Sequence, residues 1–173
     1  MPRKEVPVAS SYEAPRDDKA LPVDPTIELL PAAVMKRAHH EKLRLCQALE
    51  EIADALPGSV DRRKVLGVAN TLVPLLSSIH HYEEAVVFPL YDAVLDASGT
   101  RSSTVRRLKA EHVQDECFAG EIAEVFLAIG HGKGGESADA IGFMLRGFFE
   151  ALRRHIAFER EHILPMIGSS YTG

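Results

Sequence analysis

The sequence predicts an all-α protein, an antiparallel up-down-up-down four-helix bundle. Apolar residues recur with a 3.6-residue period in four long segments, and no segment alternates apolar and polar residues with period two. Short stretches rich in glycine, proline or serine separate the four segments. Four helices joined by short loops pack most simply as neighbours of alternating direction.

The periodic segments predict helices at 31–55, 61–95, 102–129 and 137–168. The breaks between them contain Pro57 and Gly58, then Gly99 with two potential N-caps at Ser102 and Ser103, then a glycine-rich run at 130–137. Pro74 lies inside the second predicted helix, where we expect a kink or a local irregularity, because proline cannot donate a helical hydrogen bond.

Composition divides the chain into a bundle domain at 29–170 and an extended or disordered arm at 1–28, which is rich in proline and mixed charge. The formal charge of −5 gives no electrostatic reason to expect a nucleic-acid partner. The sequence has no secretory signal and no apolar run that could cross a bilayer, so we expect a cytoplasmic protein without a membrane partner. Cys46 and Cys117 are expected to be core thiols.

Each predicted helix carries a histidine on or beside its apolar stripe. The stripe of the first helix includes Met35, His39, Leu43 and Cys46, and that of the second includes Leu76, His80, Glu84 and Val87. His112 lies on the third stripe, and His155 and Glu159 lie on the fourth. The four histidines are similarly far from the intervening turns, which places them at one height in an antiparallel bundle.

An uncompensated buried charge costs several kcal/mol, so this layer predicts bound cations. Four imidazoles and two carboxylates suit two metal ions such as iron, manganese or zinc, with each glutamate able to bridge and with positions left open for a small ligand. The alternative is a set of hydrogen-bonded core histidines without metal.

Three assignments remain open, two of them between neighbouring residues. His39 is preferred to His40 because it shares the stripe of Met35. Glu83 is the alternative to Glu84, because Pro89 follows Glu84 one residue sooner than Pro165 follows Glu159. Glu116 is either an additional ligand, a proton relay or a solvated carboxylate on the helix face.

Four segments resemble the hemerythrin-like, or HHE cation-binding, family over about residues 30–168. They are "MKRAHHEKLR" (35–44), "HHYEEAVVFPLY" (80–91), "KAEHVQDE" (109–116) and "HIAFEREHILP" (155–165). Blood-type hemerythrins have H-x-x-x-H on the third helix and H-x-x-x-x-D on the fourth, where this chain has Glu116 and Arg160. The four-His, two-Glu set is similar instead to the di-iron proteins that repair iron centres and to the hemerythrin-like domain of the F-box iron sensor.

The resemblance implies a centre of two iron ions that binds or senses dioxygen, nitric oxide, peroxide or iron itself. The alternative is a di-iron oxidoreductase that turns over peroxide or nitric oxide, or repairs iron centres, with electrons from an external protein donor. A structural bundle that holds zinc or no metal is a third hypothesis.

Overall fold

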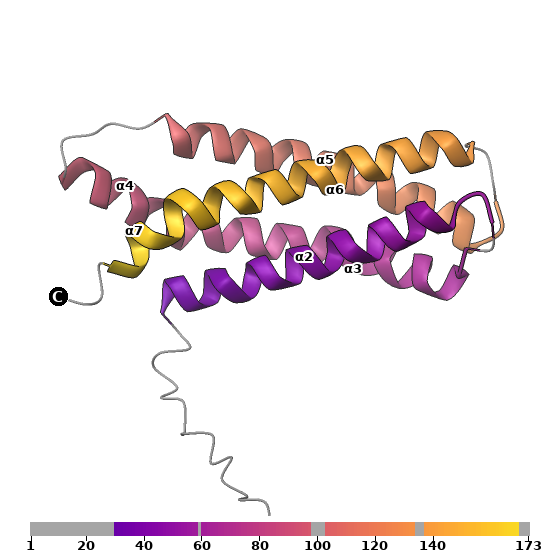
Figure 1. Ribbon diagram of the computed structural model, residues 1–173, viewed down its shortest axis with the longest axis horizontal. Coiled ribbons are helices and arrows are strands. Elements are labelled where there is room, and N and C mark those ends of the chain that lie inside the picture. The colour runs from indigo at the N-terminus through magenta and orange to yellow at the C-terminus, as the bar shows by residue number, and fades with distance from the viewer. Residues whose placement is uncertain (1–29, 59, 98–102, 134–136, 170–173) are drawn as a thin grey trace, which may run out of the picture.

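The computed structural model describes residues 30–58, 60–97, 103–133 and 137–169, and these form four helical rods side by side (Figure 1). The first rod is α2 (Pro31–Ala55). The second rod joins α3 (Arg62–Tyr82), η1 (Glu83–Val87) and α4 (Phe88–Ala97). The third rod is α5 (Thr104–Gly130). The fourth rod joins α6 (Ala138–Phe158), η2 (Glu159–Ile163) and α7 (Leu164–Ser169). The all-α four-helix prediction is confirmed, with helix ends within two residues of those expected.

Successive rods run in opposite directions (Figure 1), and the contacts between them close a ring. The most extensive contacts join α3 to α5 and α2 to α6, and smaller ones join α2 to α3 and α5 to α6. The side chains of Asp61 and Ser137 cap the N-termini of α3 and α6, whereas Ser103 makes no side-chain cap at α5. The predicted arm at 1–28 and the potential cap Ser102 lie outside the described residues.

A layer of buried polar side chains divides the apolar core in two. The larger part packs side chains from all four rods, among them Leu49, Leu72, Phe126 and Phe148. The smaller part contains Met35, Val87, Phe88, Tyr91, Leu95, Leu108, Ile163 and Ile167. The layer between them contains His39, Lys42, His80, Glu83, His112, Asp115, His155 and Glu159. Each rod therefore brings polar groups into the bundle interior at a similar height.

Two π-helical turns, η1 and η2, interrupt the second and fourth rods at this layer. The N–H of Phe88 bonds the carbonyl of Glu83, and the N–H of Leu164 bonds that of Glu159, each five residues back. A proline follows each glutamate by six residues. Because a proline ring collides with the carbonyl four residues back in an α-helix, a wider turn lets the rod continue. The irregularity expected at Pro74 lies instead at Glu83–Val87, and α3 continues through Pro74.

The two cysteines have different surroundings. Cys46 is buried, and its thiol lies 3.7 Å from the carbonyl oxygen of Phe149. Cys117 is exposed, so the expectation that both thiols lie in the core is wrong for it. Helical periodicity explains the difference, because Cys117 follows the inward Asp115 by two residues, which turns it about 200° away. Among the described helices, none is long and apolar enough to cross a membrane.

Candidate metal centre

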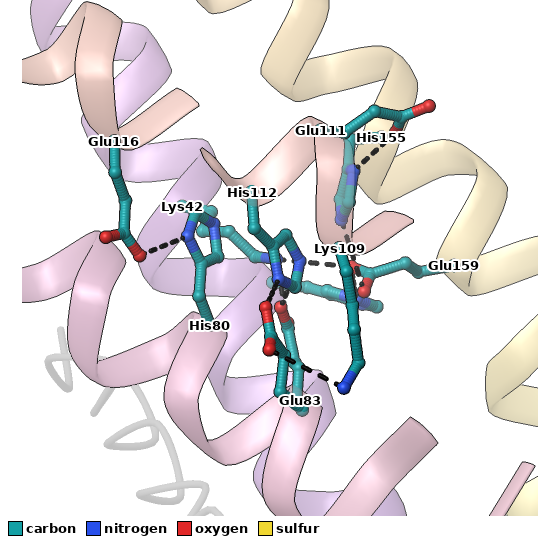
Figure 2. Close-up of polar contacts among 11 residues, drawn as sticks. Lys42, His80, Glu83, Lys109, Glu111, His112, Glu116, His155 and Glu159 are labelled. Atoms are coloured by element: carbon teal, nitrogen blue, oxygen red, sulfur yellow. Dashed lines mark hydrogen bonds and ion pairs between the residues drawn. The ribbon is translucent and has the colours of Figure 1, made fainter. Parts of the chain in front are cut away.

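Four buried side chains at the middle of the polar layer bring their donor atoms together. Glu83 comes from η1, His112 from α5, His155 from α6 and Glu159 from η2. One ligand atom from each lies within 4.8 Å of the others. Figure 2 shows these side chains converging on a common space from three rods. We call these four residues the inner cluster.

The inner cluster has a donor pair on each side. His112 Nε2 lies 3.3 Å from Glu83 Oε2, and His155 Nε2 lies 3.4 Å from Glu159 Oε1. None of these four atoms has a hydrogen-bond partner, although all are buried. An unsatisfied buried polar atom costs about 1–3 kcal/mol. A cation bound between the four atoms would remove this cost, so the residues present fit a metal ion.

Three histidines of the layer are oriented by carboxylates from neighbouring rods. His80 Nδ1 lies 3.0 Å from Glu116 Oε1, and His112 Nδ1 lies 3.0 Å from Glu84 Oε1. His155 Nδ1 lies 2.9 Å from Glu111 Oε2. An ionised carboxylate only accepts hydrogen bonds, so each Nδ1 carries the proton and donates it. In a neutral ring with its proton on Nδ1, the lone pair of Nε2 is free for a metal, as in carboxylate–histidine–metal arrangements.

His39 and His80 line the same layer beside the inner cluster. The ring of His80 stacks on that of His112, with centroids 3.9 Å apart, and its Nε2 is buried without a partner. Burial, together with the charges of His112 and Lys42, lowers the pKa of His80 to about 2, so this imidazole is neutral. His39 Nε2 lies 3.0 Å from Glu159 Oε2, and its Nδ1 is unpartnered.

Lys42 is a member of the layer that the sequence analysis missed. Its side chain is fully buried, and Nζ donates to Glu83 Oε1 at 2.7 Å and to Glu159 Oε2 at 3.2 Å (Figure 2). Burial lowers the pKa of Lys42, but the two carboxylates outweigh burial and raise it. Conversely, burial raises the pKa of Glu159, while Lys42, His155 and His39 bring it well below its ordinary value. The layer thus holds an ammonium between two carboxylates.

The structure places the other predicted site residues at different depths. His40 is exposed, so His39 is the histidine that α2 directs into the layer. Glu83 is fully buried in the inner cluster, whereas the side chain of Glu84 is 35% exposed and contacts His112 Nδ1. The inward line on this rod is Leu76, His80, Glu83 and Val87, which have helical steps of four, three and four. Glu116 is partly buried beside His80 Nδ1.

Two sequence signals could have improved the prediction of the site residues. One contact in the site has no such signal in the sequence. Lys42 follows His39 by three residues and precedes Cys46 by four, so it fits the inward stripe better than the half-buried Leu43. The equal spacing of both prolines from Glu83 and Glu159 favours Glu83. The contact of Glu111 with His155 joins two helices, and no spacing within one helix reveals it.

One of the comparisons with known proteins, that with family models, agrees with this geometry. Residues 30–167 match the family model described as the hemerythrin HHE cation binding domain, which covers every helix of the bundle but the last two residues of α7. The searches of curated proteins and of solved structures gave no match. The matched segment spans most of the chain and contains all four residues of the inner cluster. The chain belongs to the hemerythrin HHE cation-binding family.

Proposed function

We propose that this protein is a non-haem iron protein whose buried centre binds or senses a small ligand such as dioxygen, nitric oxide or peroxide. The observation that carries the proposal is the inner cluster, in which four buried donor atoms face one another without hydrogen-bond partners. Imidazole nitrogen and carboxylate oxygen suit iron, with manganese and zinc as competitors. Glu83, His112, His155 and Glu159 would hold the metal.

The surrounding residues keep the centre dry and ordered. Phe88 lies against His112, with ring centroids 5.4 Å apart, and Met35 and Leu108 are fully buried in the adjoining core. The three carboxylates on the Nδ1 atoms hold the imidazoles in one orientation. A redox-active metal held by these residues would supply the chemistry for binding a small molecule.

A cavity between α5 and α6 lies beside the centre, on the side where Glu111 contacts His155 Nδ1. It has a volume of about 410 Å³ and borders His155 of the inner cluster. Its walls include Arg107, Arg154 and Gln114, together with Asp115, whose pKa is raised by burial. The cavity is large enough for a diatomic molecule or peroxide, and its wall balances two guanidinium groups with the carboxyl groups of Glu111 and Asp115, Glu111 being paired with Arg107.

Anaerobic loading with Fe²⁺ followed by optical spectroscopy tests the proposal. We expect a new absorption band when nitric oxide or dioxygen is added and its loss when the gas is removed. The Zn²⁺-loaded protein is the spectroscopically silent control, and His131→Ala, in an exposed residue, is the control variant. An unchanged spectrum would contradict ligand binding, and sustained consumption of peroxide or nitric oxide with a reductant would favour the oxidoreductase alternative.

A further inference from the structure

The position of Lys42 has a consequence for how many metal ions the centre holds. The four oxygens of Glu83 and Glu159 divide into two sets. Glu83 Oε2 and Glu159 Oε1 face His112 and His155 and have no hydrogen-bond partner. Glu83 Oε1 and Glu159 Oε2 accept hydrogen bonds from Lys42 Nζ. One set of oxygens is free for a cation, and the other already holds one.

The arrangement of the histidines follows the same division. The donor atoms that approach one another within 4.8 Å belong to the inner cluster, and neither His39 nor His80 is part of that group. His39 Nε2 instead lies at hydrogen-bond distance from Glu159 Oε2, the oxygen that Lys42 also contacts. A second metal bridged by both glutamates would need Glu83 Oε1 and Glu159 Oε2, so it would have to displace the ammonium.

Charge favours one metal ion when Lys42 stays in place. For Glu83, Glu159 and Lys42 alone, two carboxylates, one ammonium and one divalent ion leave a single positive charge, whereas a second divalent ion would leave three. Charges removed from water are stable only when they are paired and hydrogen-bonded. The side chain of Lys42 is fully buried in the bundle, with both carboxylates as its partners, so the ammonium is itself in such a paired state.

We propose that the Lys42 ammonium occupies the position of a second metal ion, so that the centre binds one metal ion tightly at the inner cluster. This inference rests on the proposed function, because it presumes that the inner cluster binds metal. It differs from the two-iron centre that the resemblance implies, and it assigns Lys42 the role of a fixed cation between the two carboxylates.

Metal counting on the full chain tests the proposal. The proteins are Lys42→Met, which removes the ammonium but keeps an unbranched side chain, Lys42→Arg, which keeps the charge, and the matched control Lys109→Met. Lys109 lies 3.7 Å from Glu84 Oε2, so its loss changes the charge near the site without touching the inner cluster. Each protein is loaded anaerobically with Fe²⁺, desalted, and measured by native mass spectrometry and elemental analysis.

We expect one iron per chain in the wild type, in Lys42→Arg and in Lys109→Met, and two in Lys42→Met. Two irons in the wild type, or one in both the wild type and Lys42→Met, would overturn the role of Lys42 while leaving the proposed function intact. No retained iron in the wild type would overturn the proposed function, and the inference with it.

A second measurement needs no variant, so it decides the question even if Lys42→Met does not fold. The EPR spectrum of the wild type saturated with Mn²⁺ distinguishes an isolated ion from a coupled pair. We expect the six-line hyperfine pattern of isolated Mn²⁺. The many-line spectrum of an exchange-coupled pair would overturn the proposal.

Discussion

Replacing Glu83 or Glu84 with glutamine separates a metal-binding carboxylate from one that orients a histidine. Glu83 is fully buried, with Oε2 at 3.3 Å from His112 Nε2 in the inner cluster. Glu84 is partly exposed, with Oε1 at 3.0 Å from His112 Nδ1. The two residues are adjacent in sequence and contact opposite sides of one imidazole. Glu83→Gln and Glu84→Gln therefore have the same chemistry but different expected results.

The expected losses of metal affinity follow from these positions. Removing one partner of a buried charge pair costs about 3–5 kcal/mol. At about 1.4 kcal/mol per tenfold change, this lowers metal affinity about 100- to 4,000-fold in Glu83→Gln. A residue that orients a metal-bound histidine contributes about 10- to 100-fold. The loss of metal affinity in Glu84→Gln should be at or below the lower end of that range, because the glutamine amide oxygen still accepts a hydrogen bond from His112 Nδ1.

Competition with a chromophoric chelator for Zn²⁺ at pH 7 measures both affinities without redox chemistry. Urea unfolding of the metal-free variants shows whether each retains the fold, and Glu41→Gln, an exposed position on α2, is the control. An equal loss of affinity in both variants, or a larger loss in Glu84→Gln, would refute the assignment of Glu83 to the inner cluster.

Three further outcomes are expected from the same geometry. Removing the metal should lower the melting temperature, because metal held at 100 times its Kd adds about 2.7 kcal/mol to stability; equal melting curves would contradict a core site. Glu111→Gln should weaken metal binding by about 10-fold or less through the orientation of His155, because its amide oxygen still accepts from Nδ1, and a matched change at exposed Glu121 should have no effect. The metal-free protein should also lose stability on acidification below about pH 6.5, because the unfolded chain protonates His80 there while the folded protein does not until its pKa of about 2. This adds about 1.4 kcal/mol per pH unit to the slope of the unfolding free energy, and the contribution should be missing in His80→Gln. Identical slopes would show that His80 does not titrate in this way.

Helical periodicity and turn residues were enough to predict the fold. The fourth stripe is the clearest case, since Ile141, Leu145, Leu152, His155 and Glu159 are all buried as their spacing requires. The same periodicity predicted that one histidine from each rod enters a common layer. Local spacing works here because each rod is nearly continuous and buries a single face.

Local spacing was not sufficient to choose between neighbouring residues within the layer. Glu83 and Glu84 follow His80 by three and four residues, and both spacings lie on the same helix face. The equal spacing of the two prolines favours Glu83, but the π-turn that this spacing accompanies is seen only in the packed rod. Lys42 was missed because a lysine is rarely fully buried, and its partners Glu83 and Glu159 are distant in sequence.

Metal content of the anaerobically purified protein, compared with that of a His112→Ala/His155→Ala variant, tests the central claim most directly. The matched control is His40→Ala/His131→Ala, which removes two exposed imidazoles. We predict that the wild type and the control retain metal after desalting and that the inner-cluster variant does not. Metal retained by the inner-cluster variant, or absent from the wild type after loading with Fe²⁺, would contradict a metal centre formed by Glu83, His112, His155 and Glu159.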